Sequence, residues 1–138
     1  MQIGEFYFPD ELYYDEKHGW AKVEGEEVVV GLTDFTQKLA GNFLHVMLPK
    51  VGKKVKKGQP LASVESAKWV GRLYAPVGGE VVAVNEALKT APRLLNEDPY
   101  GSGWMVRLKM DNPLELKTLM QGETLVTFIE KEAAKHKK

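Results

Sequence analysis

The chain has 138 residues, of which 43% are hydrophobic and 28% charged, as in ordinary globular proteins of one domain. Nineteen basic and nineteen acidic residues give a formal net charge of zero, which argues against nucleic acid as a bulk electrostatic partner. Cysteine is absent, and this excludes a disulfide scaffold, a thiolate metal site and a cysteine nucleophile.

No stretch of the sequence approaches the roughly 18 consecutive apolar residues that a membrane-spanning helix needs. The first residues, MQIGEFYFPDE, lack the basic and then apolar layout of a secretory signal. The sequence therefore predicts one domain over residues 1–138, a cytoplasmic location, and neither membrane nor nucleic-acid partners.

The predicted elements, taken in chain order, are mostly short strands separated by glycine and proline. A short helical turn is expected at 9–16, and a hairpin follows with strands at 20–23 and 28–32. Residues 33–41 predict a helix with Gly41 at its end. Further strands are expected at 43–49, 60–66, 69–76, 80–84 and 103–110.

Two helices are predicted after the last strand. Residues 111–122 carry Pro113 at the first helical position and Gly122 as the terminator, and residues 123–135 repeat apolar side chains on one face. Because strands form the majority, the sequence predicts a mainly β protein, a sandwich or flattened barrel with a few peripheral helices.

The turn between the strands at 60–66 and 69–76 presents one lysine, Lys68. Alternation after the turn places Lys68 and Arg72 on one face of the strand and Trp69 on the other. A hairpin tip is the most exposed part of a sheet, and the paired strands below it fix its position. Lys68 is therefore either an ordinary solvated lysine or an amine held rigidly at its base for attachment of a group.

Other features of the sequence do not indicate catalysis. It contains no convincing phosphate loop, metal cluster or nucleophile–base pair. Its three histidines are scattered, and each is expected to be structural or on the surface: His18, His45 and His136.

Several segments around and beyond Lys68 resemble known proteins. One segment resembles the sequence around the modified lysine of biotinyl and lipoyl domains, namely VGKKVKKGQPLASVESAKW. Three longer segments resemble the glycine cleavage system H protein family, in the same order and at the family's spacing. They are GWAKVEGEEVVVGLTDFTQKLAGNFLHVMLPKVG, ESAKWVGRLYAPVGGEVVAVNEAL and NEDPYGSGWMVRLKM. This resemblance covers roughly residues 18–130, and simple lipoyl domains lack its segments GLTDFTQ, LYAPVGGEV and NEDPYGSGW.

The resemblance implies a lipoyl/biotinyl-type hybrid barrel-sandwich with helices at the C-terminal end. It also implies lipoate joined by an amide bond to Lys68, in a site formed with Glu65, Ser66, Ala67 and Trp69. The cofactor would supply the reactive disulfide, while the protein supplies mounting and recognition. The chain would then be a non-catalytic carrier without a metal, and it is expected to be a monomer.

In this family the carrier takes an aminomethyl group from a pyridoxal-phosphate glycine decarboxylase and delivers it to a folate-dependent aminomethyltransferase. Dihydrolipoyl dehydrogenase, a flavin enzyme, then reoxidises the dithiol. The resemblance implies these three partners, together with the lipoate ligase or lipoyl synthase machinery that attaches the cofactor.

The sequence departs from the family pattern at positions that line the cleft for the loaded arm. Gly19, next to His18, stands where the family commonly has glutamate. Arg72 stands in place of a frequent aspartate, and Lys17 in place of a small polar residue. Lys17 and Arg72 would repel the cationic end of an aminomethyl-loaded arm, so they favour an anionic or neutral load.

Three alternative carrier functions are therefore open. An H-like lipoate-binding carrier in sulfur oxidation, working with a heterodisulfide-reductase-like complex, would suit a basic cleft. A lipoyl relay that passes its group to other enzymes is the second. A biotin carrier is the third and is disfavoured, because Lys68 lacks the flanking methionines of an MKM motif.

A run of five lysines surrounds Gly52: Lys50, Lys53, Lys54, Lys56 and Lys57. The simpler interpretation is a solvated loop between strands. The other interpretation is a docking patch for an acidic partner.

Overall fold

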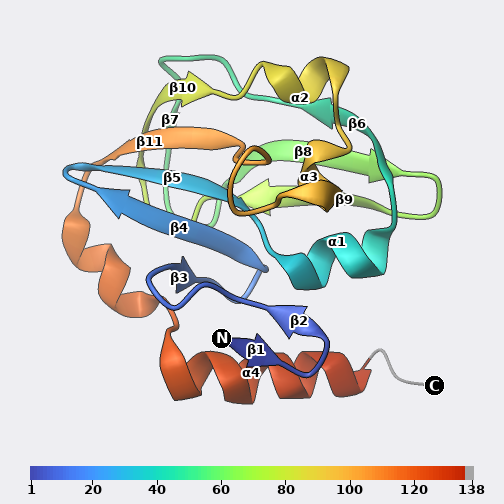
Figure 1. Ribbon diagram of the computed structural model, residues 1–138. Coiled ribbons are helices and arrows are strands. Elements are labelled where there is room, and N and C mark those ends of the chain that lie inside the picture. The colour runs from blue at the N-terminus through green and yellow to red at the C-terminus, as the bar shows by residue number, and fades with distance from the viewer. Residues whose placement is uncertain (136–138) are drawn as a thin grey trace.

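The computed structural model describes residues 1–135, and most of its strands belong to two antiparallel sheets (Figure 1). The larger sheet has six strands in the order β3-β4-β5-β11-β10-β7. Their bounds are Tyr13–Tyr14 for β3, Gly19–Glu24 for β4, Glu27–Leu32 for β5, Val106–Met110 for β11, Gly79–Val84 for β10 and Lys54–Val55 for β7. The smaller sheet has the order β6-β8-β9, with bounds Phe43–Met47, Pro60–Ser66 and Val70–Tyr74.

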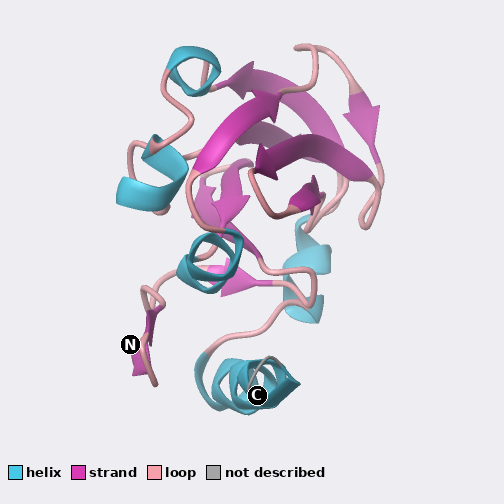
Figure 2. Ribbon diagram, turned by 90° about the vertical axis from the view of Figure 1, so that its right-hand side faces the viewer, coloured by secondary structure: helices cyan, strands magenta, loops and turns pink. Residues whose placement is uncertain are grey.

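The main core lies between these two sheets. Aliphatic side chains from both are removed from solvent there, among them Val28, Val30, Val64, Leu73, Val81 and Leu108. The strands curve around this core without closing into a barrel (Figure 2). The prediction of a mainly β, sandwich-like fold with peripheral helices is therefore confirmed.

Helices and a short hairpin complete the described chain. They are α1 (Asp34–Ala40), α2 (Ala87–Thr90), α3 (Leu94–Glu97), the 3-10 helix η1 (Pro113–Thr118) and α4 (Gly122–Lys135), with β1 (Gln2–Ile3) paired to β2 (Phe6–Tyr7). In Figure 1, α4 and the β1–β2 hairpin lie beneath the sheets. There Leu125 and Ile129 of α4 join a second core with Phe8, Trp20 and Phe35. Within residues 1–135, no helix has the length and apolar character needed to cross a lipid bilayer.

Most predicted elements are present, with ends shifted by a few residues. The hairpin β4–β5 and helix α1 are confirmed, and Gly41 follows α1 with a φ of 78°. The helical turn predicted at 9–16 is wrong, because Tyr13 and Tyr14 form strand β3 instead. Both tyrosines pair with β4, and this tertiary pairing overrides the local helical signal.

The role predicted for Gly122 is also wrong. Gly122 does not end the preceding helix; it is the first residue of α4 and has a φ of 58°. Glycine adopts this left-handed conformation at little cost, so it suits the change of direction between η1 and α4. The sequence does not predict α2 and α3, since helices of four residues leave no periodic pattern.

Candidate functional site

The candidate site is the tight turn between β8 and β9. The N–H of Ser66 donates to the carbonyl of Trp69 over 2.8 Å, and this bond encloses two loop residues, Ala67 and Lys68. Both loop residues are exposed, whereas Ser66 is buried. Lys68 forms no ion pair with a carboxylate within residues 1–135. Its amine is therefore available at the end of a rigid hairpin, which protrudes on the right of Figure 1.

Two contacts hold this turn against the end of α1. The hydroxyl of Ser66 donates to the carbonyl of Ala40 over 2.6 Å. The side chain of Lys68 passes beside Gly41, because a Cβ built on Gly41 would lie 3.3 Å from Lys68 Cε. Gly41 is also in the left-handed region, so both its backbone and the space around it favour glycine. The turn is thus positioned by β8, β9 and α1 together.

The indole of Trp69 lies back along β9. A Cβ built on Gly71 would come within 2.1 Å of Trp69 Cη2, so the ring occupies the space directly above that glycine. The ring also meets Phe43 edge-on, with centroids 6.2 Å apart and planes at 69°. Trp69 therefore stabilises the base of the turn by aromatic packing.

Glu65 lies on the outer face of the smaller sheet, one strand position before the buried Ser66. It pairs with His45 of β6 on one side and Val70 of β9 on the other. All three of these side chains are exposed. Glu65 thus shares the accessible surface of the turn with Lys68, while Ser66 supports it from below.

A cleft of about 340 Å³ opens beside the turn and extends to α4. It is lined by Glu16, Lys17, His18, Leu32, Thr36, Trp69, Gly71, Arg72, Tyr74 and Glu132. Of the four residues predicted for an arm cleft, the structure brings Lys17, His18 and Arg72 together. Gly19 does not line it; a Cβ at that buried position would meet Asp15 Oδ1 and Leu73 Cδ1 at 3.4 Å each.

The expectation of a basic cleft needs correction. Lys17 and Arg72 are present and exposed, and the Lys17 ammonium lies 5.8 Å from the ring centroid of Tyr74. The lining also contains two carboxylates, Glu16 and Glu132, which sequence reasoning missed. The cleft therefore has mixed charge, and its acids come from segments far apart in the sequence.

Glu132 forms the most buried charged contact of the cleft. His18 Nε2 lies 2.8 Å from Glu132 Oε1, and the two side chains are 18% and 16% exposed. Because an ionised carboxylate only accepts hydrogen bonds, Nε2 of His18 carries the proton. Lys135 binds the other oxygen at 2.9 Å. The hydrogen bond from Lys135, and then the one from His18, lower the pKa of Glu132.

The backbone of His18 explains why its ring reaches α4. His18 has a φ of 67°, and its ring stacks on Phe35 with centroids 4.7 Å apart. Phe128 of α4 packs near the same ring at 5.3 Å. The contact between His18 and Glu132 joins residues 114 positions apart, and no local sequence pattern indicates it.

Asp15 shapes the loop that carries Lys17 and His18. Its buried Oδ1 accepts hydrogen bonds from the backbone N–H groups of Lys17, at 3.0 Å, and Gly19, at 2.8 Å. Burial raises the pKa of Asp15, and the two backbone donors partly oppose that effect. The sequence did not single out Asp15, whose role depends on this burial.

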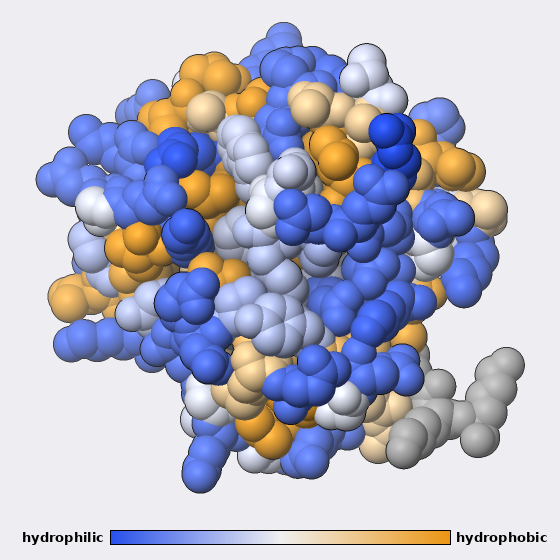
Figure 3. All heavy atoms as spheres, in the orientation of Figure 1, coloured by the Kyte–Doolittle hydropathy of each residue, from blue (hydrophilic) through white to orange (hydrophobic). Residues whose placement is uncertain are grey.

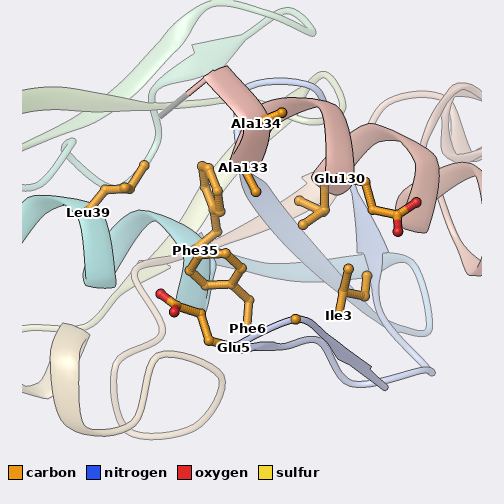
Figure 4. A pocket seen from close by; sticks show the side chains of 10 residues that line it. Ile3, Glu5, Phe6, Phe35, Leu39, Glu130, Ala133 and Ala134 are labelled. Carbon is orange, nitrogen blue, oxygen red and sulfur yellow. The ribbon is translucent and has the colours of Figure 1, made fainter. Parts of the chain in front are cut away.

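A second cavity, of about 510 Å³, lies between the β1–β2 hairpin, α1 and α4 (Figure 4). Apolar side chains such as Phe6, Phe35 and Leu39 line it, together with Glu5 and Glu130. It shares no lining residue with the cleft beside Lys68. We interpret it as a gap in the packing of α4 rather than as part of the candidate site.

The remaining histidines do not join the site. His45 is exposed on β6, and His136 lies outside the described residues. Within residues 1–135, no three His, Asp or Glu side chains are grouped closely enough to hold a metal ion.

The chain is similar to known proteins in sequence and in fold. The family model described as "Glycine cleavage H-protein" matches residues 12–132. The "Probable glycine cleavage system H protein" of Thermococcus gammatolerans is 48% identical over 132 residues, which are 94% of this chain and 98% of that protein. The "Glycine cleavage system H protein" of Thermus thermophilus is 45% identical over 125 residues, 91% of this chain and 98% of its own.

A solved structure is similar in fold. The crystal structure of a glycine cleavage system H protein from Mycobacterium marinum superposes with a TM-score of 0.78 at 28% identity, covering 91% of this chain and 99% of that one. The sulfur-oxidation alternative finds no support in these comparisons. The chain belongs to the glycine cleavage H-protein family, the lipoyl carriers of glycine cleavage.

Proposed function

We propose that Lys68 carries lipoate on its side-chain nitrogen and that the chain serves glycine cleavage as a carrier without catalytic activity of its own. The exposed amine at the fixed turn is the observation that carries this proposal. The residues present fit the group, because an amide bond would remove the charge of Lys68 and no carboxylate within residues 1–135 depends on that charge.

A bound lipoyl group supplies a disulfide that accepts and releases a carbon fragment. The chain's own residues do the positioning. Ser66 and Gly41 fix the root of the arm against α1, and Trp69 packs beside it. A tether at a fixed root keeps its end at high effective concentration for each partner active site. The proposed partners are glycine decarboxylase, the aminomethyltransferase, dihydrolipoyl dehydrogenase and the lipoate-attaching machinery.

The cleft beside the turn is the proposed resting place for the end of the arm. Glycine keeps its amino group when its carboxyl group is lost, so the cargo is an amine and is cationic at neutral pH. Glu132 matches that charge, because its hydrogen bonds with Lys135 and His18 lower its pKa and keep it ionised, and the load would share its oxygens with those two residues. It is also only partly exposed, so solvent screens it less than the exposed Lys17 and Arg72. We therefore assign to Glu132, rather than to positions 19 and 72, the carboxylate that faces the cationic end of the loaded arm, called here the facing acid.

Mass spectrometry of the protein from its native host tests the attachment. We expect a lipoyl adduct on the chain that has Lys68 and none on the Lys68→Arg variant. The circular dichroism spectra of the two proteins should be the same, which shows that the variant is folded. A biotinyl adduct, or a lipoyl adduct at another lysine, would overturn the proposal.

The facing acid is tested with the lipoylated protein and purified glycine decarboxylase. Glu132→Gln should shorten the lifetime of the loaded protein in buffer, whereas Glu130→Gln, a control on the same helix, should not. If both variants keep the load as long as the lipoylated protein without a substitution does, the assignment of Glu132 is wrong.

A further inference from the structure

The lysine run around Gly52 forms a basic surface at the opposite end of β8 from Lys68. We propose that it is a docking surface for an acidic face of a partner protein, which it holds while the arm on Lys68 stays free. The surface, called here the basic loop, consists of Lys50, Lys53, Lys54, Lys56 and Lys57. The choice of partners to test rests on the proposed carrier function.

The lysines of the basic loop form no ion pairs within the described chain, although the Lys57 amine donates to the carbonyl of Pro76 and its charge acts on the buried Asp15. All five lysines are exposed, and none forms an ion pair with a carboxylate of residues 1–135. Elsewhere Lys22, Lys38 and Lys89 each pair with an acid. Glu80 lies opposite Lys54 in the sheet, but it also faces a lysine of β11 on its other side. The loop therefore keeps a local excess of positive charge in a chain of zero net charge.

The backbone of the basic loop is held in place. The N–H of Gly52 donates to the carbonyl of Val81 over 2.7 Å, and the N–H of Val81 donates to the carbonyl of Lys53 over 2.8 Å. The N–H of Gly58 donates to the carbonyl of Ala75 over 2.8 Å. Because the main chain is already ordered, a partner that binds here loses little affinity to ordering the loop.

The position of the basic loop suits a partner that stays bound. It precedes β8, whereas Lys68 follows the same strand, and seven extended residues separate the two by roughly 20 Å. In Figure 1, β7 lies on the left and the β8–β9 turn protrudes on the right. A protein held at the basic loop would not cover Lys68, and the arm could still visit other active sites.

The composition of the loop favours a protein over a nucleic acid. Residues 50–57 contain neither arginine nor an aromatic side chain, which are common means of stacking on bases. They do contain Val51, an apolar residue that is 62% exposed. Hydrophilic and hydrophobic residues are similarly interspersed over the face drawn in Figure 3. An apolar contact ringed by charge fits an interface with an acidic rim.

The test uses the Lys68→Arg chain, which cannot be lipoylated, so that binding is measured apart from carrier function. Its binding to each of three purified enzymes, namely glycine decarboxylase, the aminomethyltransferase and dihydrolipoyl dehydrogenase, is measured at low and high salt. One variant carries Lys50→Gln, Lys53→Gln and Lys56→Gln. A control with the same change of net charge carries Lys22→Gln, Lys89→Gln and Lys131→Gln.

At 50 mM salt, we expect the loop variant to bind one of the enzymes at least about tenfold more weakly than the control does. At 500 mM salt this difference should shrink below about twofold, because salt screens the attraction between charges. Val51→Ser should weaken binding about threefold at both salt concentrations, since an apolar contact is not screened. The proposal is overturned if the loop variant and the control bind all three enzymes equally. Tighter binding to a single-stranded DNA 20-mer than to any enzyme would also overturn it.

Discussion

Replacing Ser66 by alanine should loosen the turn that presents Lys68. The substitution removes one oxygen atom and leaves the backbone and the volume of the side chain nearly unchanged. It deletes the 2.6 Å hydrogen bond from the Ser66 hydroxyl to the carbonyl of Ala40, a residue that is fully buried. That carbonyl would be left without its partner at the end of α1.

The magnitude follows from this burial. A typical intramolecular hydrogen bond contributes about 1 kcal/mol net, and leaving a buried acceptor unpaired adds to the loss, so about 2 kcal/mol is expected. In urea, with a slope of about 2 kcal/mol per molar for a domain of this size, the unfolding midpoint should fall by about 1 M. The rate of enzymatic lipoylation at Lys68 should also fall, because its target turn is less rigid.

The matched control is Ser63→Ala, three residues earlier on β8. Ser63 is half-buried and makes no side-chain hydrogen bond within the described part of the chain, so its midpoint should move by less than about 0.3 M. Equal midpoints for the two variants would refute the idea that the Ser66 hydroxyl anchors the turn to α1.

Three further changes test the surroundings of the turn. The pKa of Glu132 is lower in the folded protein than its ordinary value of 4.5, so its ionised form stabilises the fold above pH 4.5. This stabilisation is lost as the pH falls through the pKa of the folded protein. Glu132→Gln should therefore narrow the difference in Tm between pH 7 and pH 3. Burial raises the pKa of Asp15, so ionisation lowers stability as the pH rises above 3.8. Asp15→Asn, which keeps the accepting Oδ1, should raise the Tm at pH 7 and leave it unchanged at pH 3, and a lower Tm at pH 7 would contradict this. Gly71→Ala should displace the Trp69 ring and cost about 1–3 kcal/mol of unfolding free energy in urea; an unchanged midpoint would show that the ring moves freely.

The position of Lys68 could be predicted because it depends on local patterns. Alternating strands on both sides and a two-residue loop are visible in the sequence, and hydrogen bonding across β8 and β9 reproduces them. The setting of Gly41 after α1 follows from a helix stop signal in the same way. By contrast, the helical turn expected at 9–16 fails because β4 supplies backbone partners that no local pattern contains.

The sequence by itself determined the mainly β class and the lysine that the β8–β9 turn presents, because strand alternation and turn residues act over a few positions. It also indicated the family, through the resemblance of whole segments such as GLTDFTQ and NEDPYGSGW. The tertiary structure alone decided which charges meet in the cleft. Glu132 reaches His18 across 114 residues only because α4 packs beneath the sheets on apolar side chains such as Leu125 and Ile129. Contacts of that kind depend on how whole helices and sheets pack together. The acidic residues that take part in them therefore cannot be predicted from residues adjacent in the sequence.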